Sequence, residues 1–300
     1  MKLKKLIVIA LLAFTMGACA TTPQEKDAFK ETNVQIDSTR KTKIQGTLTV
    51  PTTEAENGYP LVVMSHGFLG SRDESGSFTK VAQELAKKGI ASIRIDFPGC
   101  NESKENFLLY SLENMQQDVK SAIAYAKNEI EVDEKKIGML GYSMGGRVTS
   151  LYLDKEDVNT VVLWAPAVSD GASAMRYMGS EEEILQKIAD SKESGKSTIS
   201  IWGKDVEVSH DYLAQMSETQ PTKNLSLFKG SILFVTGGSD EVVTSEISKP
   251  GIEACVNTKI TAHLEVPRAD HSLGAGYNED EQVNQVVTNA TVDFFVKQMQ

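Results

Sequence analysis

The sequence predicts an α/β protein whose central sheet is mostly parallel and covered by helices on both faces. The predicted strands are short, continuous apolar runs, as expected of strands that are buried on both faces. They are separated by segments with apolar residues three or four positions apart, the spacing typical of helices that cover a sheet. The 300 residues, of which 40% are hydrophobic, are enough for one large core.

The elements follow one another in a regular order. Residues 33–37 and 43–50 alternate polar and apolar residues, which predicts an opening antiparallel pair. After this pair, strands and helices alternate along the chain. The predicted strands are 61–64, 90–96, 137–140, 161–164, 231–236 and 259–266, and the predicted helices are 78–88, 112–130 and 283–299.

One interval breaks this order. The 66 residues between Trp164 and Ser231 are far more than one crossover helix needs. We predict a helix at 181–190, a short hairpin at 198–208 and a second helix at 210–216. An ordered insertion of this length is typical of a lid or a substrate wall, and the alternative is a solvated decoration of the fold.

The first residues lie outside the predicted fold. Three lysines precede an apolar run at residues 6–16 that is too short to span a membrane, which predicts a signal peptide at 1–18. Residues 16–19 (Met-Gly-Ala-Cys) resemble the lipobox of bacterial lipoproteins, although Met16 replaces the usual leucine. This resemblance implies a lipid on Cys19, a polar tether at 19–32 and a place in the bacterial cell envelope outside the cytoplasm. The alternative is an ordinary secreted protein cleaved nearby.

Charge and cysteine content exclude several classes of partner. Loss of residues 1–18 removes three lysines, so the net charge changes from −10 to −13, with 28 basic and 41 acidic residues. This acidity argues against nucleic acid and against electrostatic binding to anionic lipid. No CxxC is present and the four histidines are scattered, so we expect no metal and no cofactor. A disulfide between Cys100 and Cys255 stays open.

A candidate nucleophile follows the strand predicted at 137–140. Residues 141–145 form a G-x-S-x-G pattern that opens into a helical segment at 147–153, the context of a nucleophile elbow. Glycines must flank Ser143 in so tight a turn because a Cβ would collide with neighbouring backbone. We therefore expect the Ser143 hydroxyl to project from the carboxyl end of the sheet.

A serine hydroxyl needs a base, and the base needs an orienting acid. In this architecture the acid and then the histidine should each follow a strand. Asp240 follows the strand at 231–236 and His271 follows the strand at 259–266. We expect these two residues to complete the set with Ser143.

Four residues compete for these roles. Asp170, just after the strand at 161–164, is the alternative acid, and Glu241 adjoins Asp240 but is one position too far along. His263 lies inside a predicted strand, and His210 lies in the insertion, where substrate contact is the most it could make.

Two backbone N–H groups are candidates for the oxyanion hole, which binds the charge that develops on a substrate oxygen. The N–H of Met144 follows the nucleophile at a helix N-terminus. The N–H of Phe68 lies in the loop after the strand at 61–64, where Gly67 permits close approach of the backbone. We expect His66 to buttress this loop and not to act as a base.

Together these motifs resemble the α/β-hydrolase superfamily over residues 33–300, and within it bacterial carboxylesterases of the cinnamoyl and feruloyl type. That resemblance implies a catalytic triad of Ser143, Asp240 and His271, and a cap at about 167–230 over an aromatic acyl group. It also offers Trp202, Tyr212 and Tyr177 as substrate-binding wall residues. The motifs that carry the resemblance are His66-Gly67-Phe68, Asp96-Phe97-Pro98-Gly99, residues 141–146, Gly237-Gly238-Ser239-Asp240 and His271.

The sequence therefore predicts a serine esterase that acts on a small-molecule ester. A peptidase of the prolyl-oligopeptidase type shares the fold and the triad, but such enzymes usually add a propeller or a large N-terminal domain. A non-catalytic lipoprotein that binds a hydrophobic ligand under the cap is the alternative from another class. The acyl group, the alcohol and the oligomeric state are not predicted.

Overall fold

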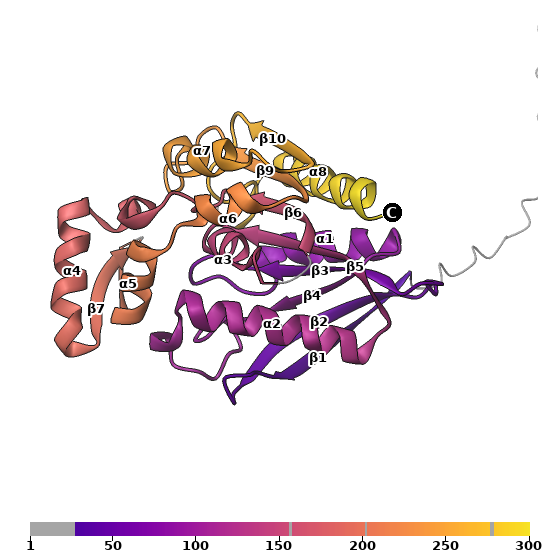
Figure 1. Cartoon of the computed structure of the whole chain (residues 1–300), viewed down its shortest axis with the longest axis horizontal. Helices are drawn as coiled ribbons and strands as arrows, with labels where there is room; N and C mark the ends of the chain where they lie inside the picture. Colours follow the sequence, from indigo (N-terminus) through magenta and orange to yellow (C-terminus); the bar gives the residue numbers. More distant parts are fainter. Residues whose placement is uncertain (1–27, 156–157, 202, 277–278) are drawn as a thin grey trace, which may run out of the picture.

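The computed structural model describes residues 28–155, 158–201, 203–276 and 279–300 (Figure 1). Within these residues, eight strands form one sheet in the order β1-β2-β4-β3-β5-β6-β9-β10. The six strands from β4 to β10 run parallel, which confirms the mostly parallel sheet. The strands are β1 (Phe29–Asp37), β2 (Lys43–Pro51), β3 (Tyr59–Ser65), β4 (Ala91–Ile95), β5 (Val132–Tyr142), β6 (Val158–Trp164), β9 (Ser231–Gly237) and β10 (Ile260–Val266).

The opening antiparallel pair is longer than the alternation of residues predicted. β1 begins at Phe29, four residues before the predicted start, and pairs with β2 along its whole length from Phe29↔Pro51 to Asp37↔Lys43. The residues that follow Phe29 are polar but gain ladder partners from β2, and a hydrogen-bonded ladder does not require an apolar side chain. Residues 29–32 therefore belong to the sheet.

Helices cover both faces of this sheet. α1 (Ser77–Lys87) packs with α8 (Glu281–Met299) on one face, whereas α2 (Leu112–Glu129), α3 (Met144–Tyr152) and α6 (Pro221–Leu227) lie on the other, with α7 (Ser245–Ala254) beside α6. Successive residues of one strand enter opposite cores, because side chains alternate along a strand. Leu61 and Val63 pack on the α2 and α3 side, while Val62 and Met64 pack with Phe78 on the α1 and α8 side. This double burial explains the continuous apolar runs.

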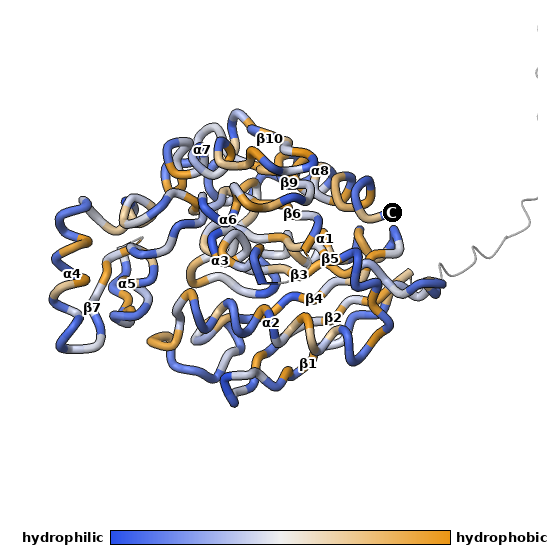
Figure 2. The backbone as a smooth tube through the Cα atoms, in the orientation of Figure 1, coloured by the Kyte–Doolittle hydropathy of each residue, from blue (hydrophilic) through white to orange (hydrophobic). Residues whose placement is uncertain are grey.

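The insertion lies beside the carboxyl ends of the strands (Figure 1), and its buried residues share one core with the body of the protein. It contains η3 (Gly171–Met178), α4 (Glu181–Ser194), the hairpin β7 (Lys196–Ile201) and β8 (Lys204–Ser209), and α5 (His210–Glu218). These are the predicted helix, hairpin and helix, each a few residues longer. α4 extends because a Ser180–Glu183 capping box begins it and Gly195 ends it at φ 74°. Hydrophobic and hydrophilic residues alternate along α4 (Figure 2).

One buried arginine of α3 ties both ends of this cap to the body. The Arg147 side chain is fully buried, and its Nη1 donates to the carbonyls of Ala167 at 3.0 Å and Ser169 at 2.7 Å. Its Nη2 donates to the carbonyl of Met216 at 2.9 Å and to the carbonyl and hydroxyl of Thr219 at 3.1 and 2.8 Å. Burial lowers the pKa of Arg147 to about 10. A single guanidinium thus clamps the entry and exit segments of the cap.

Several predictions concern residues of the N-terminus and the cap that lie outside the described part of the chain. The signal peptide, Cys19 and Trp202 lie outside the described part of the chain, so lipid attachment stays a prediction. Within the described residues no helix is both long and apolar enough to cross a bilayer. Cys100 and Cys255 are both free thiols in the structure.

Candidate active site

The turn after β5 holds Ser143 in a strained conformation. Ser143 has φ 53° and ψ −113°, a backbone region that non-glycine residues rarely adopt and that clusters at active sites. Its N–H donates to the carbonyl of Trp164 at 2.8 Å, and α3 begins at the next residue. β6, β5 and α3 together fix the turn that presents the Ser143 hydroxyl.

The flanking glycines are required by close packing, as the sequence predicted. A Cβ on Gly141 would lie 2.5 Å from the carbonyl oxygen of Gly145. A Cβ on Gly145 would overlap the carbonyl oxygen of Ser65, at the end of the neighbouring strand β3. The helix can therefore start against the sheet only because neither residue has a side chain.

The structure brings Ser143, His271 and Asp240 together from three different segments. The Ser143 hydroxyl lies 3.0 Å from His271 Nε2, and His271 Nδ1 lies 2.8 Å from Asp240 Oδ2. With Nδ1 protonated and donating to the carboxylate, Nε2 can accept the serine proton, which is the arrangement that activates a serine. Both residues follow the ends of parallel strands, β9 for the aspartate and β10 for the histidine.

The acid and the base are each held by further hydrogen bonds. Asp240 Oδ1 accepts the N–H groups of Val242 and Val243, both at 2.8 Å, so Oδ2 is left for the imidazole. The Tyr142 hydroxyl donates to the backbone carbonyl of His271 at 2.9 Å, and the two rings lie 5.2 Å apart. The residue before the nucleophile thus also holds the loop that carries the histidine.

The four competing residues are engaged elsewhere or exposed. The carboxylate of Asp170 accepts the N–H of a threonine in α6 at 3.1 Å, and Glu241 is exposed to solvent. His263 Nε2 lies 2.8 Å from a threonine hydroxyl of β9, and His210 Nδ1 lies 2.9 Å from a serine hydroxyl of α4. None of these contacts leads to Ser143.

His66 is locked into the loop after β3. Its Nε2 accepts the N–H of Phe97 at 2.9 Å, so Nδ1 carries the proton and donates to the carbonyl of Gly67 at 2.8 Å. The ring is fully buried, and burial lowers its pKa to about 4. His66 is therefore neutral near pH 7 and buttresses the loop, as predicted.

The two predicted oxyanion donors both border the nucleophile. A Cβ built on Gly67, the residue before Phe68, would lie only 3.4 Å from the Cβ of Ser143. Met144 directly follows Ser143 and is the first residue of α3. No described residue accepts a hydrogen bond from the N–H of Phe68 or of Met144. Both donors are therefore available to a substrate oxygen.

A cavity of about 530 Å³ opens beside Ser143 and His271. Most of its wall is apolar. The wall is formed by the loop after β3, the ends of β5 and β6, and the loop after β10. The lining residues are Gly67, Phe68, Leu69, Gly70, Glu74, Ser75, Ser77, Tyr142, Ser143, Trp164, His271, Ser272, Ala275 and Gly276.

Of the expected cap residues, the two that the structure describes, Tyr177 and Tyr212, are not among those that line this cavity. Tyr212 is fully buried, with its ring 5.7 Å from that of Phe68, and its hydroxyl lies 3.3 Å from that of Tyr177. Tyr212 packs behind the oxyanion loop because the apolar face of α5 turns toward the body of the protein. Among the described residues, the cap supports the loop and the loop lines the cavity.

The sequence reasoning missed three residues of this region. Trp164 ends a parallel strand at its carboxyl end, and the rule that ligands bind there could have identified it. Arg147 is the one charged residue in an otherwise small and apolar helix start, which was a usable signal. Glu74 had no local signal.

Within the described residues no group of three or more His, Cys, Asp or Glu side chains could hold a metal ion.

The chain is similar in sequence to several known proteins. The sequence model of the family described as serine aminopeptidase, S33, matches residues 59–215, just over half of the chain. The curated quorum-quenching protein AidA of Acinetobacter baumannii is 33% identical over 116 residues, which cover 38% of this chain and 36% of AidA. The chain thus matches only about a third of the length of such curated relatives.

Solved structures match over almost the whole chain. Est1E of Butyrivibrio proteoclasticus with bound ferulic acid has a TM-score of 0.68 at 21% identity, and the match covers 88% of this chain and 98% of Est1E. The Pyrococcus furiosus esterase Pf2001 has a TM-score of 0.64 at 18% identity, covering 94% and 98%. At these identities the likeness establishes the α/β-hydrolase fold.

Proposed function

The chain belongs to the serine aminopeptidase S33 family, and from this membership and the site geometry we propose that it is a serine hydrolase of carboxylic esters. It is an esterase-like α/β-hydrolase, and the proposal concerns the bond it cleaves and the intermediate it forms. The observation that carries the proposal is the hydrogen-bonded chain from Ser143 through His271 to Asp240 beside an open cavity.

The first half of the proposed reaction forms an acyl-enzyme. Ser143 Oγ attacks the ester carbonyl carbon while its proton passes to His271 Nε2. The N–H groups of Phe68 and Met144 donate to the oxygen that becomes negative, and the Asp240 carboxylate stabilises the imidazolium. The tetrahedral intermediate then collapses, and His271 gives its proton to the leaving alkoxide, which departs as the alcohol.

The second half releases the acid. Water enters the place of the alcohol, and His271 takes its proton as the oxygen attacks the acyl carbon. Collapse of the second intermediate breaks the bond to Ser143 Oγ, which recovers its proton from His271. The products are a carboxylic acid and the free enzyme, and no step needs a cofactor.

The cavity favours a compact, apolar acyl group. Phe68, Leu69, Trp164 and Ala275 supply an apolar wall of a size suited to a short-chain or single-ring acid. Ferulic acid is bound in Est1E, which has the same fold, and this supports a hydroxycinnamoyl ester as one candidate substrate. Other small acyl esters fit the same wall.

A second candidate is peptide hydrolysis. The family description names a serine aminopeptidase, and the same serine, histidine and aspartate would cleave an amide. The amine of an amide is a poorer leaving group than the alcohol of an ester and needs protonation to depart. The two activities can be compared on one protein sample.

The proposal is tested by covalent labelling and by a substrate panel. A fluorophosphonate probe should label the wild type once, and Ser143→Ala should abolish both labelling and hydrolysis. Ser150→Ala is the matched control on the same helix, because its hydroxyl donates to the Gly146 carbonyl at 2.8 Å and not to the triad. Equal labelling of the Ser143→Ala variant contradicts the nucleophile.

The panel compares p-nitrophenyl esters of short and long acids, hydroxycinnamoyl esters and aminoacyl anilides. We expect kcat/KM to be highest for short or hydroxycinnamoyl esters. Faster turnover of anilides would contradict the esterase proposal and favour a peptidase. Saturable ligand binding without any hydrolysis would contradict both activities and favour a binding protein.

A further inference from the structure

One carboxylate of the cavity wall holds the loop that carries an oxyanion donor. Glu74 lies in the short η1 turn (Glu74–Gly76) that precedes α1. Its Oε1 accepts the N–H of Gly67 at 2.9 Å, and Gly67 is the residue directly before Phe68. Oε1 lies so close to Gly70 that a Cβ there would overlap it. The carboxylate therefore fills the inside of the loop.

Gly67 needs such an external contact. It has no side chain to fix its backbone, and a Cβ there would lie 3.0 Å from the ring of Tyr142, so the ring would have to move to admit one. The direction of the Phe68 N–H depends on the backbone of Gly67. The Gly67 carbonyl already accepts hydrogen bonds from His66 Nδ1 at 2.8 Å and from the Gly70 N–H at 3.1 Å. The bond from the Gly67 N–H to Glu74 holds the other side of this residue, so both of its peptide groups are fixed.

The backbone at Glu74 is itself held in an unfavourable conformation. Glu74 has φ 41° and the next residue, Ser75, has φ 50°, both in the left-handed region although neither is glycine. Such conformations persist where the surroundings determine them, and they cluster at functional sites. The conformation aims the Glu74 side chain back under the loop.

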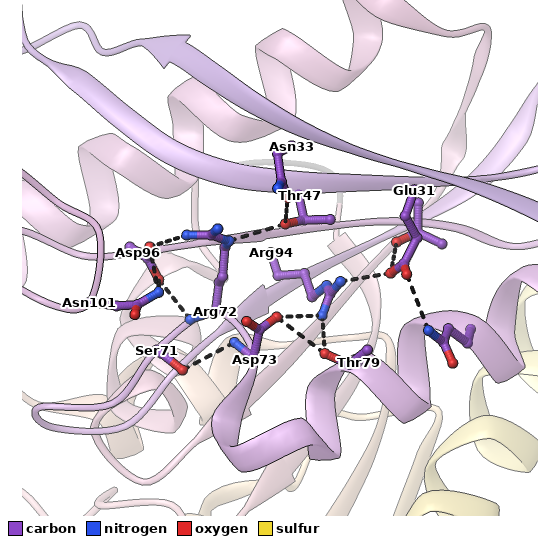
Figure 3. A network of polar contacts seen from close by, with 12 residues as sticks. Glu31, Asn33, Thr47, Ser71, Arg72, Asp73, Thr79, Arg94, Asp96 and Asn101 are labelled. Carbon is purple, nitrogen blue, oxygen red and sulfur yellow. Dashed lines mark hydrogen bonds and ion pairs between the residues drawn. The ribbon is translucent and has the colours of Figure 1, made fainter.

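A network of ion pairs supplies these surroundings (Figure 3). The Arg72 N–H donates to Asp96 Oδ1 at 2.8 Å, and its guanidinium pairs with the same carboxylate and donates to Thr47 of β2. Arg94 of β4 donates to Asp73 Oδ1 at 2.9 Å and to a glutamate of β1 at 2.7 Å. The two residues before Glu74 are therefore anchored to β2 and β4, and through Arg94 to β1.

The carboxylate is kept at this place although burial disfavours its charge. The Glu74 side chain is 13% exposed, and its one partner of the basic residue types is His66, which is neutral and whose Nδ1 lies 4.0 Å away. Within the described residues no lysine or arginine pairs with it. Burial raises the pKa of Glu74 to about 7, against the opposite effect of hydrogen bonds from the backbone of Gly67 and Ser71. Glu74 is thus a carboxyl group in the cavity wall whose position is not accounted for by an ion pair with a lysine or arginine among the described residues.

We propose that Glu74 is a positioning residue for hydrolysis, which through Gly67 fixes the Phe68 N–H in the direction of the substrate oxygen. This inference rests on the proposed function, since it concerns the oxyanion hole of that reaction. Glu74 transfers no proton. Its contribution is the acceptor at a fixed place, so the geometry of the side chain matters more than its charge.

Three variants separate geometry from charge. Glu74→Gln keeps the length and an amide oxygen that can accept the Gly67 N–H. Glu74→Asp keeps the charge but withdraws the acceptor by one methylene, and Glu74→Ala removes the acceptor. Initial rates on a p-nitrophenyl ester at pH 8.5, above the Glu74 pKa, give kcat and KM for each variant.

We expect Glu74→Ala and Glu74→Asp to lower kcat by about 10- to 100-fold, up to the loss caused by removing one oxyanion donor, with KM changed by less than about 3-fold. Glu74→Gln should retain kcat within about 3-fold of wild type. Circular dichroism confirms that each variant is folded. If Glu74→Ala does not fold, the order of Gln above Asp still decides the question.

The results that overturn the proposal are distinct from failure of the proposed function. Wild-type kcat in Glu74→Ala, or Glu74→Asp more active than Glu74→Gln, contradicts positioning by geometry while Ser143 remains the nucleophile. Hydrolysis that survives Ser143→Ala contradicts the proposed function itself, whatever the Glu74 variants do.

Discussion

Replacing Arg147 by methionine should loosen the cap and lower the stability of the whole protein. The variant keeps an apolar chain of similar length but removes every donor. The carbonyls of Ala167, Ser169 and Met216 are left fully buried without that partner. Each unsatisfied buried carbonyl costs about 1–3 kcal/mol, and removal of a buried cation returns part of the sum. We expect a net loss of about 3 kcal/mol in the free energy of unfolding.

Urea unfolding followed by circular dichroism measures this loss. Arg176→Met is the matched control, because Arg176 is an exposed residue of the cap that pairs with exposed Glu246. The control should change the unfolding free energy by less than about 1 kcal/mol. If Arg147→Met stays within about 1 kcal/mol of wild type, the guanidinium does not hold the cap, and the clamp must be sought in apolar packing.

Two further predictions concern the catalytic turn and its acid. Asp240→Asn should lower kcat for a p-nitrophenyl ester by about 10⁴-fold with an unchanged fold, because the amide favours the wrong imidazole tautomer; a loss below about 10-fold would point to another acid. Gly145→Ala should lower the unfolding free energy by more than about 3 kcal/mol, because its Cβ would overlap the Ser65 carbonyl. Gly195→Ala, where the Cβ meets nothing within 4 Å, should lose about 1 kcal/mol through its positive φ alone, and equal losses in a denaturant titration would refute the packing argument.

The sequence was most informative where local chemistry decides the structure. Continuous apolar runs predicted a sheet buried on both faces, and the glycines around Ser143 predicted a turn in which a Cβ would collide with neighbouring backbone. The chain order of Ser143, Asp240 and His271 was sufficient to find residues that lie 128 and 31 positions apart yet form hydrogen bonds. Each of them follows a strand, and parallel strands bring their carboxyl ends to one edge.

The sequence was least informative where packing between distant segments decides. An aromatic residue on an amphipathic helix can face a cavity or a core, and nothing local distinguished these for Tyr212. Glu74 is placed by pairs such as Arg94 with Glu31, 63 residues apart, and Arg72 with Asp96, 24 residues apart. Neither pair has a periodic pattern, so the support of the oxyanion loop became visible only in three dimensions.

Because Tyr212 lies behind Phe68, substitutions in the loops and substitutions in the cap should have different effects on the enzyme. Substitutions in the loops after β3 and β10 change the surface that a substrate touches, so they are the places to alter selectivity. Among the described residues, Tyr212 of the cap packs against the ring of Phe68, so substitutions there alter how firmly a donor is held. A library directed at new substrates should therefore vary the two loops first, while one directed at robustness should vary the cap.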